Sequence, residues 1–221
     1  MGLGLLAWRE GQVEAAREYF EDARRTFRNS SDQVREAYAV GNLGLIHGAL
    51  GDSDRQLSSY QQVLQIQETI GDVDGLRIAH NNLGDLHYQR GDYAQAIYYY
   101  NKLAQLSRDT GHKRMLCLAH SGLADVYLAK GDPHQALDHA LKAAQAAREI
   151  GPGDEAGISW RVLGDVRLAL GDARQAIACF EQSLPLLQEA RDEEQLLKGR
   201  RGLEAARSRL SAESSIQSSG G

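Results

Sequence analysis

Three aspartates stand forty residues apart, at Asp85, Asp125 and Asp165. Each follows a small residue inside a segment with helical periodicity, so the three predict an acidic ladder with one aspartate in each forty-residue unit. Such a ladder can pair with Lys or Arg side chains of a ligand. Two other interpretations stay open. A charged residue on a helix is usually solvated surface, and Asp165 lies four residues from Arg161, a spacing at which the two side chains can pair with each other.

Other groups that could do chemistry lack the partners they would need. His80 and His120 are equivalent residues forty apart, and His87 follows His80 by seven, but no His-x3-His pair or suitably spaced carboxylate accompanies them. We expect these histidines in packing or at the surface. Cys117 and Cys179 form no Cys-x-x-Cys motif, and no phosphate-binding loop is present. The sequence therefore predicts no metal, no cofactor and no enzymatic activity.

Composition narrows the class of protein further. The 221 residues carry a formal net charge of −5, which argues against a nucleic-acid-binding surface. No apolar run approaches the length of about 20 residues that a membrane span needs, and no signal peptide is recognisable. Two cysteines within apolar helical patterns fit a reduced, cytoplasmic setting. We expect a protein that contacts neither membrane nor nucleic acid.

The elements that position these residues follow from an internal repeat. A leucine recurs every forty residues and precedes a small residue, which we call the small position: Gly4, Gly44, Gly84, Ala124 and Gly164. Seven residues later stands another glycine, four times followed by aspartate. Glycine ends a helix readily and aspartate caps the next one. Each repeat is therefore predicted as a helix, a tight turn, a second helix and a short loop.

The same signals predict the boundaries. We expect repeats near 1–31, 32–71, 72–111, 112–151 and 152–191, a capping helix at 192–212 and a disordered tail at 213–221. The first helices are expected near 2–10, 33–50, 73–90, 113–130 and 155–170. The second helices are expected near 12–28, 53–70, 92–110, 133–150 and 172–190. The first helix is shorter than its counterparts, as in an N-terminally truncated fragment.

A glycine inside a helix costs about 1 kcal/mol of stability relative to alanine. Close packing at the small positions must therefore offset this cost. We expect Ala96 and Ala176, in the second helices, to face these glycines. Aromatic residues four positions later are expected to fill the space between successive repeats: Phe20, Tyr60, Tyr100 and Phe180. Gln56 and Ala140 depart from this pattern, and their junctions are predicted to be weaker.

The pattern resembles the tetratricopeptide repeat (TPR). The third repeat carries it best, with Asn82-Leu83-Gly84 in the first helix and Gly91-Asp92, Ala96 and Tyr100 after it. The resemblance covers about residues 2–211, although the period is forty instead of about 34. Longer units of this kind are similar to repeats of kinesin light chains, Pins-type adaptors and the sensor arms of bacterial signalling ATPases and transcription regulators. The resemblance implies an all-α, right-handed superhelical solenoid.

In this family the first helices line a concave groove that binds a peptide. Residues three before and one, four and five after the small position share a helix face. Together with Asn82, they give the expected groove residues: Leu45, Asn81, Asn82, Asp85, Tyr88, Gln89, Ser121, Asp125, Leu128, Arg161, Asp165, Leu168 and Arg201. The leucines and the tyrosine would contact apolar groups, the asparagines the peptide backbone, and the aspartates basic side chains.

The resemblance implies a non-enzymatic protein-protein interaction module that acts as an adaptor or scaffold. Its expected ligand is a protein or peptide with basic residues, bound by a monomer. A chaperone C-terminal tail is not expected, because aspartates stand where that TPR subclass has Lys and Asn. The alternative is a sensor or regulatory arm of a larger signalling ATPase or transcription regulator.

Overall fold

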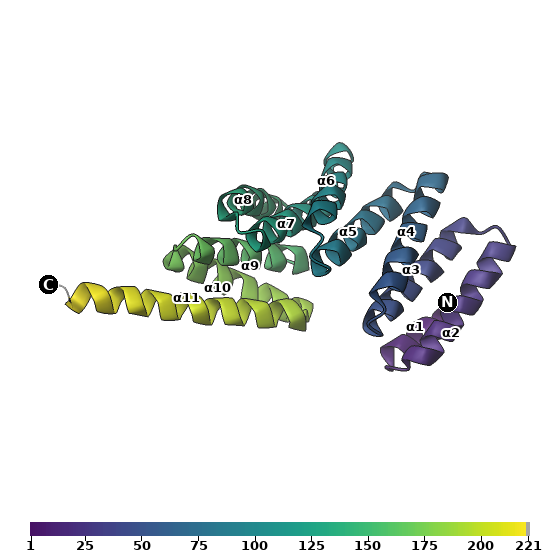
Figure 1. Cartoon of the computed structure of the whole chain (residues 1–221), viewed down its shortest axis with the longest axis horizontal. Coiled ribbons are helices and arrows are strands. Elements are labelled where there is room, and N and C mark those ends of the chain that lie inside the picture. Colours follow the sequence, from purple (N-terminus) through teal and green to yellow (C-terminus); the bar gives the residue numbers. More distant parts are fainter. Residues whose placement is uncertain (220–221) are drawn as a thin grey trace. The chain divides into compact units, whose positions relative to one another are not determined.

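The computed structural model describes residues 1–219, and the side chains of residues 1–213. Within that part the chain forms eleven α-helices and no strand (Figure 1). In chain order the helices are α1 (Gly2–Arg9), α2 (Val13–Asn29), α3 (Gln33–Ala49), α4 (Ser53–Ile70), α5 (Val73–Gln89), α6 (Tyr93–Asp109), α7 (Lys113–Ala129), α8 (Pro133–Ile150), α9 (Asp154–Ala169), α10 (Ala173–Ala190) and α11 (Glu193–Ser219).

The predicted helix stops and starts are confirmed. The Asp52 carboxylate accepts a hydrogen bond from the backbone N–H of Arg55 at 3.0 Å and so caps α4. Asp92, Asp132 and Asp172 cap α6, α8 and α10 in the same way. The glycines between helices have positive φ, which a residue without a side chain adopts at little cost. These are Gly11, Gly51, Gly71, Gly91, Gly111, Gly131, Gly151 and Gly171.

Helices α1 to α10 begin and end within one residue of their predicted bounds. The last helix differs, since α11 continues to Ser219 where we expected an end at 212 and a disordered tail from 213. The sequence from 203 to 213 is rich in Leu, Ala, Glu and Arg and contains no Gly or Pro to stop a helix. The last two residues of the expected tail, 220 and 221, lie outside the described part.

The chain divides into two compact units, Met1–Leu86 (unit 1) and the part from His87 onward (unit 2). In unit 1, Phe20 of α2 lies in a buried cluster with Leu43 and Ile46 of α3. In unit 2, consecutive helices from α6 to α11 pack against one another (Figure 1). Each unit is thus built from helices adjacent in sequence, as a repeat array requires.

Aromatic rings of the second helices occupy the space above the glycines. A Cβ atom added at Gly44 would lie 2.5 Å from the Tyr60 ring, and one at Gly164 would lie 2.7 Å from the Phe180 ring. The Phe180 ring also reaches the following helix, where a Cβ at Gly202 would lie 2.4 Å away. One ring therefore packs against its own repeat and the next helix, and glycine makes both approaches possible.

At Gly164 the atoms nearest to an added Cβ belong to Phe180, and not to Ala176 as expected. Ala176 lies in a buried cluster against which Leu168 packs, and Ala96 lies in a cluster against which Tyr88 packs. Leu168 and Tyr88 stand four residues after the small position. Each alanine therefore shares a cluster with this larger side chain, and at Gly164 the aromatic residue covers the glycine.

Two departures from the repeat are matched by a second departure across the contact. Gln56 replaces the alanine, and a Cβ at Gly48 would lie 2.6 Å from its Nε2 atom, so the long amide fills the space left by a small partner. Ala140 replaces the aromatic residue, and it shares a buried cluster with Val162, which stands where Gly202 stands in the last helix. Side-chain size is thus exchanged between partners. The prediction that these junctions are weaker took into account only one of the two residues in each contact.

Candidate functional site

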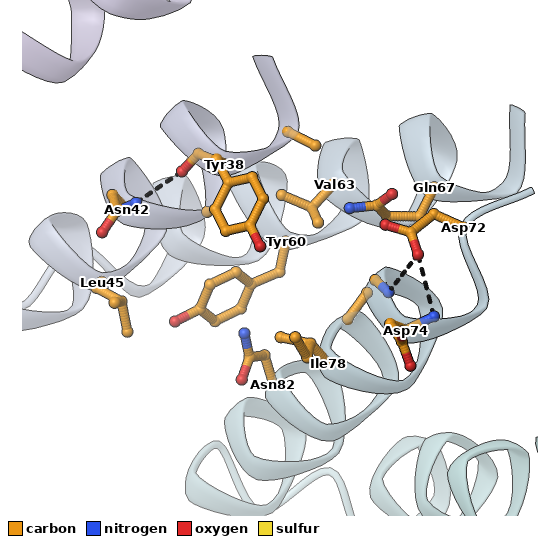
Figure 2. A pocket seen from close by; sticks show the side chains of 14 residues that line it. Tyr38, Asn42, Leu45, Tyr60, Val63, Gln67, Asp72, Asp74, Ile78 and Asn82 are labelled. Carbon is orange, nitrogen blue, oxygen red and sulfur yellow. Dashed lines mark hydrogen bonds between the residues drawn. The ribbon is translucent and has the colours of Figure 1, made fainter. Parts of the chain in front are cut away.

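Unit 1 contains a cleft of about 210 Å³ between α3, α4 and α5 (Figure 2). Three apolar side chains on its rim are exposed: Tyr38 is 61%, Leu45 49% and Ile78 47% exposed. Tyr60 and Val63 of α4 are buried beneath them and form the floor. Apolar side chains gathered around a cleft and left about half exposed are typical of a surface that binds another protein.

Amides and carboxylates complete the cleft. Asn42 uses its side-chain N–H to donate to the carbonyl of Tyr38 at 2.7 Å, and Asn82 points into the cleft from α5 (Figure 2). Asp72 accepts backbone N–H groups of Asp74 and Gly75 at 3.1 Å each and so begins α5. The lining residues include these two aspartates and no Lys, Arg or His, although Asp74 forms an ion pair with the buried Arg77. The cleft therefore favours an apolar group with no negative charge.

The carboxylate of Asp85 lies near Tyr60, which lines the cleft of unit 1. Asn81 donates its side-chain N–H to Asp85 at 2.9 Å, so these two expected groove residues contact each other. Burial raises the pKa of Tyr60 above its ordinary value. A hydrogen bond to Gln56 opposes that change, and the Asp85 charge adds to it. The Tyr60 hydroxyl stays protonated and can donate a hydrogen bond.

Unit 2 contains a wider groove of about 540 Å³. Tyr88 and Leu128 supply apolar surface, and Asp125 and Asp165 come from α7 and α9. Arg161 lies at the base and is only 4% exposed. The cations on the rim, Lys198 and Arg201, come from α11.

Arg161 holds both aspartates of this groove. Its Nη2 donates to Asp125 Oδ2 at 2.9 Å, and its Nη1 donates to Asp165 Oδ2. Burial lowers the pKa of Arg161, but the two carboxylates more than offset this, and the net change is upward. Burial also raises the pKa of Asp165 to about 6, although Arg161 opposes the change. The ion pairs join α7 to α9 and engage both carboxylates.

The structure distributes the expected groove residues between these two places. Leu45 and Asn82 line the cleft of unit 1. Six line the groove of unit 2: Tyr88, Asp125, Leu128, Arg161, Asp165 and Arg201. Gln89 is exposed outside both, Ser121 is buried at 2% exposure, and Leu168 packs against a buried cluster.

Two rim residues of the unit 1 cleft escaped the sequence analysis. Tyr38 and Ile78 both stand six residues before the small position, and Tyr38 lies seven residues before Leu45 on the same helix face. The signal was present, because the equivalent positions in later repeats are also apolar, at Leu118 and Ile158.

Two other kinds of site were sought in the described part of the chain. Among its side chains, no three His, Cys, Asp or Glu residues gather closely enough to hold a metal ion. Its helices include none that is long and apolar enough to cross a membrane.

Comparison with known proteins identifies the fold family. The family model of the MalT-like TPR region matches residues 3–210. The chain belongs to this family. The TPR resemblance of the sequence is therefore confirmed, and this TPR fold supports a protein-interaction module. No curated protein sequence matches the chain.

Solved TPR structures share the fold at low sequence identity. BtubC from P. vanneervenii is 17% identical with a TM-score of 0.68, and the match covers 95% of this chain and 91% of that one. A Rap protein complexed with competence and sporulation factor is 14% identical with a TM-score of 0.74, covering 97% and 62%. A STAND protein with a tetratricopeptide repeat sensor, from Pyrococcus horikoshii, is 15% identical with a TM-score of 0.74, covering 93% and 31%. The all-α TPR solenoid fold agrees with the sequence-based prediction.

Proposed function

We propose that this TPR protein binds a peptide segment of a partner protein, catalyses no reaction and acts as an adaptor or scaffold. The observation that carries the proposal is the unit 1 cleft, where Tyr38, Leu45 and Ile78 leave about half or more of their surface exposed around a buried floor. Its volume of about 210 Å³ lies below the usual range for small-molecule sites and suits one large side chain.

The chemistry of the cleft defines its ligand. A Leu, Phe or Trp side chain of the partner would remove apolar surface of Leu45 and Ile78 from water. The amide of Asn82 would bond the backbone of the peptide. Asp74 forms an ion pair with Arg77, so Asp72 is the carboxylate that favours a basic residue next to this apolar anchor. The module would act as a monomer in the cytoplasm.

A second candidate function is a sensor or regulatory arm of a larger signalling protein. The observations that favour it are the match to the MalT-like TPR region and the likeness to a STAND protein, of whose chain this one covers 31%. An ATPase or DNA-binding domain encoded in the same gene would support this function, in which the bound segment belongs to the parent protein.

The proposed peptide site can be tested with a matched pair of leucines. Leu45 and Leu50 are 49% and 45% exposed at the end of α3, and only Leu45 lines the cleft. Peptides would be selected from a displayed random 12-residue library against the wild-type protein and titrated by fluorescence anisotropy. We expect Leu45→Ala to weaken binding about tenfold, as the loss of a well-buried apolar contact does. Leu50→Ala should change the affinity less than twofold.

Two results would contradict the proposal. One is a library that yields no binding peptide, and the other is an equal loss in both variants, which would place the ligand away from the cleft. Far-UV circular dichroism of both variants would show that the helices are intact.

A further inference from the structure

The aspartates of the unit 2 groove are committed to the protein itself. Arg161 is 4% exposed, and its two terminal nitrogens bond Asp125 and Asp165. A basic ligand that drew either carboxylate away would weaken the pairing of a buried guanidinium, and a buried charge without its partners is strongly destabilising. The expectation that these two aspartates bind Lys or Arg of a ligand therefore loses its physical basis in this groove.

The charges that remain available come from α11, the helix that follows the five repeats. Lys198 and Arg201 line the groove. The Lys198 ammonium lies 2.6 Å from Glu194 Oε1, but that glutamate is highly exposed and the pair is a weak surface contact. Arg201 is exposed and forms no ion pair with any described side chain. Arg161 pairs with the two carboxylates of the lining and Lys198 with Glu194, which leaves Arg201 as the lining cation available to a ligand.

We propose that the unit 2 groove binds an acidic segment of a partner protein, with Arg201 of α11 as the residue that selects it. A guanidinium can hold a carboxylate through two parallel hydrogen bonds, a geometry that lysine does not offer. Tyr88 and Leu128 offer apolar surface to a neighbouring residue of the same segment. The inference rests on the proposed function and adds a second ligand chemistry, opposite in charge to that of the unit 1 cleft.

The test uses three labelled hexapeptides that share two leucines and carry Glu, Gln or Lys at the other four positions. Affinities would be measured by fluorescence anisotropy with the full chain at two salt concentrations. We expect the Glu peptide to bind about tenfold more tightly than the Gln peptide, the Lys peptide to bind most weakly, and the preference to shrink at high salt.

Arg200 provides a matched control for Arg201. Both are exposed arginines on α11, and only Arg201 lines the groove. Arg201→Glu and Arg200→Glu change the net charge of the protein equally. We expect Arg201→Glu to weaken binding of the Glu peptide at least tenfold and Arg200→Glu less than twofold.

Other outcomes overturn the inference. Equal losses in the two variants would mean non-specific attraction to a basic helix, and tighter binding of the Lys peptide would return the groove to basic ligands. Neither result bears on the proposed function, which is tested separately by Leu45→Ala in unit 1. If Leu45→Ala has no effect while Arg201→Glu abolishes binding of the Glu peptide, the acidic site stands and the cleft assignment fails.

Discussion

At the residue scale, the glycines of this chain differ in what surrounds them. Gly44 and Gly41 both lie within α3. A Cβ at Gly44 would lie 2.5 Å from the Tyr60 ring, whereas at Gly41 the nearest atom is Val63 Cγ2 at 3.8 Å, an ordinary contact. Alanine has a higher helix propensity than glycine at both positions. Whether a substitution raises or lowers the free energy of unfolding therefore depends on the atoms around each glycine.

We therefore predict opposite effects for two substitutions on one helix. Gly41→Ala should raise the free energy of unfolding by about 0.5–1 kcal/mol, because it only improves helix propensity. Gly44→Ala should lower it by roughly 1–3 kcal/mol, because the Tyr60 ring must move. Urea unfolding followed by circular dichroism measures both. Equal effects would mean that the ring does not limit the space at Gly44.

The sequence could predict a residue of the candidate site only where its position on one helix face is enough to place it there. The repeat register placed Leu45 and Asn82 on the expected groove face, and both residues line the cleft of unit 1. It could not show that Arg161 bonds Asp125, because the two stand 36 residues apart and only the packing of α7 near α9 brings them together. The pairing of Arg161 with Asp165, four residues away on one helix, was considered among the alternatives.

At the scale of elements, the boundaries were predictable because they depend on local chemistry. An Asp side chain caps the helix that follows it, and a glycine with positive φ ends the one before it, without help from distant residues. The contacts between helices were less predictable. Which residue faces a small position depends on the rotation of two helices about their axes, and here the aromatic residue takes the place expected for alanine.

One helix contains a residue that opposes its own structure. Pro185 lies inside α10 and is exposed. It has no N–H to donate to the carbonyl four residues earlier, and its ring crowds that carbonyl. We predict that Pro185→Ala raises the free energy of unfolding by roughly 1–3 kcal/mol, measured by urea unfolding. The neighbouring exposed substitution Gln182→Ala should change it by less than about 0.5 kcal/mol. A destabilised Pro185→Ala protein would mean that the ring makes a contact the helix needs.

At the scale of the whole molecule, unit 2 responds to pH through groups with opposite effects. His120 Nδ1 lies 3.2 Å from His139 Nδ1. Burial lowers the pKa of His120 to about 4, and the charges of His139, Lys142 and Arg108 add to this while Asp138 opposes it. Burial lowers the pKa of His139 as well. The folded state therefore prefers neutral imidazoles, and their contribution to stability is lost as pH falls from about 6.5 toward 4.

Asp165 acts in the other direction. Its pKa in the folded protein is about 6, above the ordinary 3.8, so the folded state takes up a proton before the unfolded state does. A fall in pH through 6 therefore adds stability. We predict that Asp165→Asn makes the free energy of unfolding fall more steeply between pH 7 and pH 5 than in the wild type, by about 1 kcal/mol. Urea unfolding at the two pH values measures this. An unchanged slope would place the pKa of Asp165 near its ordinary value.

The exchange of side-chain size between Ala140 of the fourth repeat and Val162 of the fifth has a consequence for the history of the gene. The repeats are alike in length and turn chemistry, yet they are not interchangeable parts. Unequal crossing-over that removed one forty-residue unit could set Tyr100 against Val162, where it now meets Gly122. Each copy is thus tied to its neighbours. An array of this kind can lose the freedom to gain or shed units even while its sequence still records the duplications that built it.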